Sequence, residues 1–255
     1  SMSDALQKSE NIPAVWLLNE IGVNTGFQFA KKMGIPLADE DKNLSLALGG
    51  MSKGTNTLEM AQAYSAFANG GELREAYAIK SITDSEDKTV FKADTTPERV
   101  MSETTAYQMT QMMQKVVESG TGKKARINRP VAGKTGTTQS GYSGISSNRD
   151  VWFVGYTPEW TAAVWMGYDE PDKKHLLKNS SPLAAAFWGK VMEEALKDFP
   201  VKPFPDSGNL DIPDPTEDPT ANQAIADLSA QYDPSTMTVN LSWTGVPTEG
   251  VEYHI

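Results

Sequence analysis

The sequence contains no cysteine and only two histidines, His175 and His254. Disulfides and thiolate chemistry are therefore excluded, and a structural zinc site lacks its usual ligands. No apolar run reaches the roughly 18 to 20 residues that a membrane helix needs, and the first residues, SMSDALQKSE, are not those of a signal peptide. We expect any export or anchoring segment of the parent protein to lie upstream of this sequence.

Basic residues are also scarce. Lysine and arginine number 23 against 33 aspartates and glutamates, which gives a formal charge of −10. This balance argues against a phosphate backbone or an anionic lipid surface as the main ligand, so we predict no nucleic-acid partner. The hydrophobic content of 39% over 255 residues is enough for a real core, so the chain is expected to be globular.

Apolar residues at helical spacing predict a series of helices. A short helix capped by Ser1 or Ser3 runs to about Leu6, and others run over about 13–21, 57–69, 102–119 and 181–199. The side chains predicted to face inward are Val15, Leu18 and Ile21, then Leu58, Ala61, Tyr64 and Phe67, then Ala106, Met109, Met113 and Val116, and finally Ala184, Phe187, Val191 and Ala195.

Strands are predicted in two places. Residues 76–82 and 88–92 flank an acidic turn and are typical of a hairpin. Residues 151–157 and 160–168 are apolar on both faces, which predicts neighbouring antiparallel strands covered by helices on each side.

The composition changes sharply after Phe199, where prolines gather among acidic and hydroxyl residues. We predict three parts: a first domain over 1–200, a proline-rich linker over 201–226 and a β module over 227–255. The last part alternates in the β manner and is weakly similar to the start of a fibronectin type III sandwich, with Trp243 as its core aromatic residue. It is too short for a complete sandwich, so we predict that it is truncated.

The most informative short stretch is Lys134-Thr135-Gly136-Thr137-Thr138. A cation, hydroxyls and a glycine on one extended segment suit a site that binds a substrate carboxylate while the backbone approaches closely. Taken alone, the triplet is more typical of an ordinary strand with surface polar residues. Upstream, Ser9-Glu10-Asn11 forms a Ser-x-Asn sequence, which by itself is compatible with a helix cap or an Asx-turn.

Together, in this order, the two motifs resemble those of penicillin-binding proteins and serine β-lactamases. The resemblance covers roughly residues 3–198. Within this range the chain is similar to the bifunctional class A penicillin-binding proteins in the stretches DALQKSENIPAVWLLNEIGV, TLEMAQAYSAFANGG, ESGTGKKA and RPVAGKTGTT. It implies the α+β transpeptidase fold, a central antiparallel sheet with helices on both faces, here incomplete at the N-terminus.

The resemblance also implies roles for single residues. Ser9 would relay protons between active-site lysines, and Asn11 would hold the amide of the donor peptide. Lys134 would supply positive charge, and Thr137 would donate its backbone N–H to an oxyanion. The motif residues implied to bind the substrate are Asn11, Thr135, Gly136, Thr137 and Thr138.

The activity implied for the parent protein is D,D-transpeptidation or carboxypeptidation by a serine, with D-Ala-D-Ala stem peptides of peptidoglycan as substrate and β-lactams as inhibitors. No metal or organic cofactor is implied. The parent would act on the outer face of the bacterial membrane and would carry a glycosyltransferase domain and an anchor outside this sequence.

The nucleophile motif of the family, Ser-x-x-Lys, belongs upstream of Ser-x-Asn, yet only eight residues precede Ser9. We therefore expect the nucleophile in a missing N-terminal part of the same protein, which would be a partner of this chain, and we expect the chain alone to be inactive. The literal match Ser85-Glu86-Asp87-Lys88 lies in an acidic turn, where nothing positions the lysine as a base. His175 is interpreted as a solvated loop residue, and Trp152, Trp165 and Trp188 as core residues.

Two other functional classes fit the same motifs. One is a penicillin-sensing or wall-binding domain without turnover, and the other is a serine β-lactamase. Slow or absent D-Ala release would favour the first, and rapid β-lactam hydrolysis the second.

Overall fold

The computed structural model describes residues 1–205, 229–233 and 238–242. The chain divides into two compact units, Ser1–Leu210 and Asp211–Ile255. None of the helices in the described residues is long and apolar enough to cross a bilayer.

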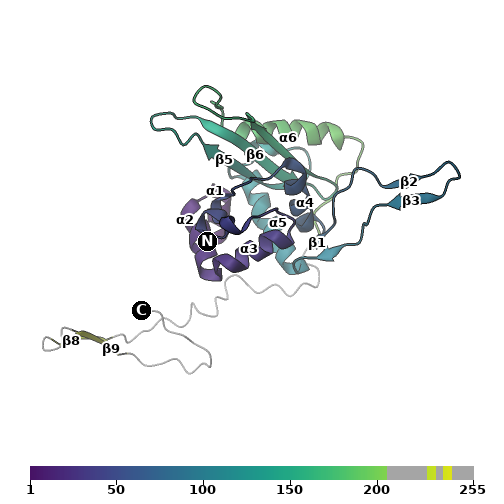
Figure 1. Ribbon diagram of the computed structural model, residues 1–255. Helices are drawn as coiled ribbons and strands as arrows, with labels where there is room; N and C mark the ends of the chain where they lie inside the picture. The colour runs from purple at the N-terminus through teal and green to yellow at the C-terminus, as the bar shows by residue number, and fades with distance from the viewer. Residues whose placement is uncertain (206–228, 234–237, 243–255) are drawn as a thin grey trace. The chain divides into compact units, whose positions relative to one another are not determined.

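The first unit is built on an antiparallel sheet of three strands in the order β5-β6-β7 (Figure 1). These strands are β5 (Ala132–Gln139), β6 (Asn148–Tyr156) and β7 (Thr161–Gly167). The pairing of β6 with β7 confirms the two neighbouring strands predicted from their apolar pattern. β5 contains the Lys-Thr-Gly motif and places Lys134 opposite Val154 and Gly136 opposite Trp152.

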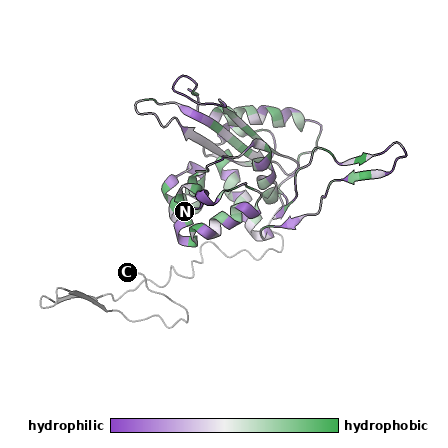
Figure 2. Cartoon of the chain, in the orientation of Figure 1, coloured by the Kyte–Doolittle hydropathy of each residue, from purple (hydrophilic) through white to green (hydrophobic). Residues whose placement is uncertain are grey.

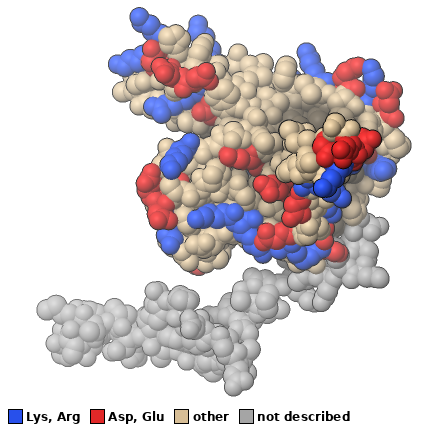
Figure 3. Space-filling model, turned by 45° about the vertical axis from the view of Figure 1, so that its right-hand side comes forward, with Lys and Arg blue, Asp and Glu red and all other residues tan. Residues whose placement is uncertain are grey.

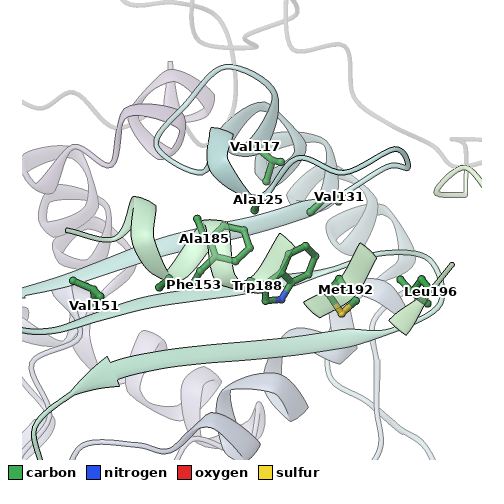
Figure 4. Close-up of a cluster of buried hydrophobic side chains, with 10 residues drawn as sticks. Val117, Ala125, Val131, Val151, Phe153, Ala185, Trp188, Met192 and Leu196 are labelled. Carbon is green, nitrogen blue, oxygen red and sulfur yellow. The ribbon is translucent and has the colours of Figure 1, made fainter. Parts of the chain in front are cut away.

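Helix α6 (Pro182–Ala195) covers one face of the sheet. Its Trp188 is fully buried and meets the ring of Phe153 edge-on, with centroids 5.2 Å apart, at the centre of the cluster drawn in Figure 4. Phe187 and Val191, which were predicted to face inward, are instead 52% and 45% exposed. Ala184 is fully buried as predicted. Apolar residues lie on both sides of this helix, so the sequence pattern does not distinguish the buried side, and the prediction was wrong for Phe187 and Val191.

Helices α4 (Thr57–Ala68) and α5 (Glu103–Glu118) cover the opposite face. The predicted cap at Ser102 and the buried stripe of α5 are confirmed, with Ala106, Met113 and Val116 at most 2% exposed. The Thr110 hydroxyl joins this helix to the sheet through a 2.8 Å hydrogen bond with the Tyr156 hydroxyl. In α4 the prediction for Leu58 was wrong: it is 63% exposed, and the small residues Ala63 and Ala66 are buried instead.

The N-terminal segment forms helices α1 (Met2–Lys8), α2 (Asn11–Ile21) and α3 (Val23–Lys32), followed by the short 3-10 turns η1 (Asp39–Asp41) and η2 (Leu44–Leu48). Ser1 caps α1 as predicted, in a reciprocal capping box with Asp4. Leu18 is buried as predicted, whereas Ile21 is 50% exposed because it lies in the last turn of α2, before Gly22.

An arm of the first unit extends from its body between α4 and α5 (Figure 1). Short strands β1 (Glu72–Leu73) and β4 (Glu98–Arg99) pair at its base, and β2 (Ser81–Thr83) and β3 (Thr89–Lys92) form the predicted hairpin. All residues of β2 and β3 are exposed, and Figure 2 shows apolar positions among them.

The face of the molecule in Figure 3 carries acidic and basic side chains intermixed, with no continuous basic surface.

Beyond α6 the chain continues to pack on the first unit. Phe204 is 8% exposed and meets the Tyr156 ring edge-on, so the packed part extends past the boundary predicted at residue 200. In the second unit β8 (Ser229–Asp233) pairs with β9 (Thr238–Ser242), which agrees with the first two strands predicted there. The predicted third strand, Trp243 and most of the predicted linker lie outside the described residues.

Candidate active site

Ser9 and Lys134 meet in space although 125 positions separate them. Lys134 Nζ donates a hydrogen bond of 2.7 Å to Ser9 Oγ, which is the contact that the motif assignment requires. Ser9 terminates α1 in the left-handed conformation, with φ 59° and ψ 48°, and its N–H donates back to the carbonyl of Leu6. A left-handed serine is strained, and such strain is typical of residues whose position serves a function.

Strand β5 positions the lysine. Lys134 is on the same face of the sheet as Ala132, which α4 and α5 cover, since residues two apart on a strand share a face. Burial lowers the pKa of the Lys134 ammonium from 10.5 to about 8, because desolvation penalises its charged form. At neutral pH this amine is therefore mostly charged, but it gives up its proton far more readily than an exposed lysine.

The two threonines of the motif differ in their surroundings. Thr135 is 8% exposed, and its hydroxyl lies 2.7 Å from the hydroxyl of Thr121. Thr137 is exposed. Thr135 and Thr137 share one face of β5, and strand alternation puts that face opposite to the one that carries Lys134. A ligand at the edge of β5 would reach both faces, and β5 is an edge strand of the sheet in the described residues.

The remaining motif residues flank this centre. Gly136 approaches β6 closely, since a Cβ there would lie 3.1 Å from Trp152 Cβ. The Thr138 hydroxyl donates to Asp150 Oδ1, which also accepts from the indole N–H of Trp152. Asn11 is exposed and is the first residue of α2; within the described residues its side chain makes no hydrogen bond with β5.

Sequence reasoning missed Thr121 and Asp150 as neighbours of the motif. The signal for Thr121 was the small-residue stretch Ser119-Gly120-Thr121-Gly122, which was noticed only as part of the resemblance. The signal for Asp150 was its place in Asn148-Arg149-Asp150, directly before the aromatic part of β6.

Ser85 and His175 were the other candidates for a catalytic role, and the tryptophans were predicted to be core residues. Ser85 is exposed in the turn of the β2–β3 hairpin, as expected for a residue without a catalytic role. His175 is exposed as expected and lies 2.9 Å from Asp172. Trp188 is in the core, but Trp152 and Trp165 are only half-buried.

A separate pocket of about 440 Å³ lies between the end of α4, the β6–β7 turn and α6. It is lined by residues that include Asn69, Glu159, Trp160, Val191 and Met192, and it contains no residue of the two motifs. The chemistry expected from the motifs therefore belongs to the Ser9–Lys134 centre rather than to this pocket.

Comparison with known proteins identifies the family of the chain. The profile of the family "Penicillin binding protein transpeptidase domain" matches residues 1–193. The chain belongs to the penicillin-binding protein transpeptidase family.

Two curated penicillin-binding proteins are similar to this chain. The chain is 38% identical over 259 residues to penicillin-binding protein 1F of Bacillus subtilis, covering 100% of this chain and 35% of the relative. It is 39% identical over 206 residues to penicillin-binding protein 1A of Clostridium botulinum, covering 79% of this chain and 24% of the relative. The chain thus spans about a third or less of the length of these relatives.

Solved structures of penicillin-binding proteins share the fold. PonA1 of Mycobacterium tuberculosis superposes with a TM-score of 0.70 at 26% identity, over 80% of this chain and 59% of that one. Penicillin-binding protein 1A of Haemophilus influenzae superposes with a TM-score of 0.67 at 21% identity, over 100% of this chain and 41% of that one. The α+β transpeptidase fold implied by the resemblance is confirmed.

Proposed function

We propose that this chain forms one wall of a D,D-transpeptidase site, at which a serine is acylated by the D-Ala-D-Ala end of a peptidoglycan stem peptide. The observation that carries the proposal is the 2.7 Å contact between Lys134 Nζ and Ser9 Oγ. A hydroxyl within hydrogen-bond reach of an amine suits proton transfer, and a generic fold has no need to bring these two motifs together.

In this proposal Ser9 relays a proton and Lys134 supplies positive charge. A serine nucleophile attacks only when a base takes its proton, and a nearby cation lowers the pKa of that base toward neutrality. The depressed pKa of Lys134, about 8, is compatible with a group that shares its proton with the Ser9 hydroxyl during turnover. The pair would thereby move the proton toward the leaving D-Ala.

The edge of β5 would bind the substrate. Lys134 and the hydroxyls of Thr135 and Thr137 would attract the terminal carboxylate, and Gly136 would leave room for the substrate backbone to pair with the strand. The Thr137 N–H would donate to the oxyanion, a contribution of about 3 to 4 kcal/mol in comparable enzymes. Asn11, two residues after Ser9, would hold the amide of the donor peptide.

The reaction of the whole protein follows from these roles. The nucleophile, a serine of a Ser-x-x-Lys motif in a segment outside this chain, attacks the penultimate D-Ala carbonyl, and the terminal D-Ala leaves with the relayed proton. An amine of a neighbouring stem peptide then attacks the ester and releases the serine. A β-lactam would acylate the same serine, with its ring C–N bond broken, and leave a stable ester there. One related structure, PonA1, is described in complex with penicillin V.

The proposal is tested by treating the chain and the longer protein that contains it with a labelled penicillin, followed by mass spectrometry of the peptides. We expect one label per longer protein, on a serine outside this chain, and no label on the chain alone. A label on Ser85 or on another serine of this chain would overturn the proposal. Rapid release of hydrolysed penicillin would favour a β-lactamase, and stable acylation without D-Ala release from peptide substrates would favour a sensor.

A further inference from the structure

The loop between α5 and the 3-10 turn η3 (Lys123–Ala125) lies against the helix that carries Ser9. The Thr121 N–H donates to the Gln7 carbonyl over 3.2 Å, and the Gln7 side-chain amide donates to Ser119 Oγ over 2.7 Å. Gln7 is two residues before Ser9 in the sequence. The loop thus fixes the end of α1 at the point where the serine leaves the helix.

The same loop is bonded to the strand that carries Lys134. Thr121 Oγ1 lies 2.7 Å from Thr135 Oγ1, and Thr135 follows Lys134 directly. Gly122 packs the loop closely on the sheet, since a Cβ there would lie 3.1 Å from Cε2 of the buried Phe153 ring. One residue, Thr121, therefore contacts both walls of the centre, through its backbone on one side and its hydroxyl on the other.

The fit of this loop is close. A Cβ on Gly120 would lie 2.4 Å from the Gln7 carbonyl oxygen, a backbone atom that cannot move without moving α1. Packing at this density transmits small displacements instead of absorbing them. A shift of the loop relative to β5 would therefore change the distance between Ser9 and Lys134.

From these contacts we infer that Thr121 is a positioning residue, which holds α1 and β5 in register so that Ser9 Oγ stays within hydrogen-bond reach of Lys134 Nζ. The inference rests on the proposed function for its catalytic meaning, although the coupling between α1 and β5 is a property of the chain itself.

The Thr121 hydroxyl also affects how Thr135 can bind a substrate. If Thr121 donates to Thr135, the Thr135 O–H is left free to donate to a substrate carboxylate.

The first experiment follows the titration of Lys134 by NMR in the chain, with ¹³C-labelled lysine. Thr121→Val keeps the shape of the side chain and removes the hydroxyl. We expect the pKa of Lys134 to rise from about 8 toward 10.5, by about 1, as the walls separate and water reaches the amine. Thr121→Ser retains the hydroxyl and should restore the original titration.

Thr110→Val is the matched control, because it too removes a hydroxyl that bonds to another hydroxyl, that of Tyr156, within the same unit. A comparable loss of stability is expected there, with no change in the Lys134 titration. An unchanged titration in Thr121→Val, or an equal change in Thr110→Val, would overturn the inference. If Thr121→Val does not fold, Thr121→Ala removes the hydroxyl without a second branch and is judged by the same criteria.

A second readout separates this inference from the proposed function. In the longer protein, penicillin acylation should fall about tenfold in Thr121→Val, as expected for the loss of one hydrogen bond to a positioned group, and Thr121→Ser should recover it. Acylation equal to wild type in Thr121→Val would overturn the positioning role. A wild-type protein that is not acylated at all would refute the proposed function, while the Lys134 titration would still decide the coupling.

Discussion

Ser9 Oγ accepts a 2.7 Å hydrogen bond from Lys134 Nζ while the Ser9 backbone has the left-handed conformation, with φ 59°. The hydrogen bond and the strained backbone conformation are thus found at the same residue. α1 ends at this residue, and the left-handed turn separates it from α2, which begins at Asn11. The serine hydroxyl is thus held at a helix end, where a glycine would be the lower-energy residue.

This strain predicts a difference between two substitutions. Ser9→Gly and Ser9→Ala both remove the hydroxyl, but only glycine adopts positive φ without steric cost. We expect Ser9→Gly to be more stable than Ser9→Ala by about 1 kcal/mol, and both to lose the Lys134 contact. Urea unfolding of the two variants measures the difference. Equal stabilities would show that position 9 is not left-handed in solution.

The depressed pKa of Lys134 predicts a pH dependence of stability. The unfolded chain binds this proton with a pKa near 10.5, whereas the folded chain binds it with a pKa of about 8. The unfolded state therefore holds more protons between these values, so the contribution of Lys134 to stability increases as the pH rises from 8 to 10.5. Below pH 8 the full cost of burying the charge is present.

The difference in unfolding free energy between the wild type and Lys134→Met isolates this effect, because the other titrating groups contribute equally to both proteins and cancel in the difference. We expect the unfolding free energy of the wild type to rise relative to that of the methionine variant between pH 8 and 10.5. A stability difference that is constant over this range would contradict the lowered pKa.

Gly120 predicts a large effect from a single methyl group. A Cβ at this position would lie 2.4 Å from the Gln7 carbonyl oxygen, so Gly120→Ala should push α1 away and cost about 1 to 3 kcal/mol. Gly189→Ala in α6 is the matched control, because its nearest neighbours lie at 3.4 Å and alanine favours a helix. Thermal unfolding should rank Gly120→Ala well below Gly189→Ala, and the opposite order would refute the close packing of α1.

The ion pair between Arg129 and Glu159 predicts strong coupling far from the motif. Their side chains are each 7% exposed and 3.4 Å apart, and Arg129 also donates to the carbonyls of Leu196 and Phe199 beyond α6. Removing one partner leaves a buried charge, so Arg129→Met and Glu159→Leu should each cost about 3 to 5 kcal/mol. The double variant should cost much less than the sum. Additive costs in a double-mutant cycle would contradict a buried pair.

Much of the fold was predictable because local signals and burial agree in it. Ser102, with an apolar stripe behind it, predicted α5, and the doubly apolar strands predicted the β6–β7 pair. The helix Val23–Lys32 was not predicted. The buried face was predicted wrongly where both sides of a helix are apolar: Phe187 in α6 and Leu58 in α4 are exposed. In such segments tertiary packing decides which stripe is buried, and periodicity does not distinguish the stripes.

The site was predictable in its members but not in its contacts. Resemblance placed Ser9 and Lys134 together, and the structure has them in contact. The hydroxyl pair of Thr121 with Thr135 depends on how a loop crosses the end of β5, which no local pattern encodes. The opposite facing of Lys134 and Thr135 follows from strand alternation alone.

The central claim is that the Ser9–Lys134 contact serves acyl transfer. The chain offers a matched control outside the motifs, since Lys115 Nζ of α5 donates to Ser3 Oγ of α1 over 3.1 Å. The direct test is the rate of penicillin acylation of the longer protein in Ser9→Ala, Lys134→Met, Ser3→Ala and Lys115→Met. We predict that Ser9→Ala and Lys134→Met each slow acylation by about 100-fold or more, which is the range for a lost proton-transfer group. In the controls Ser3→Ala and Lys115→Met we predict rates within roughly twofold of wild type. Equal rates in all four variants would contradict the account.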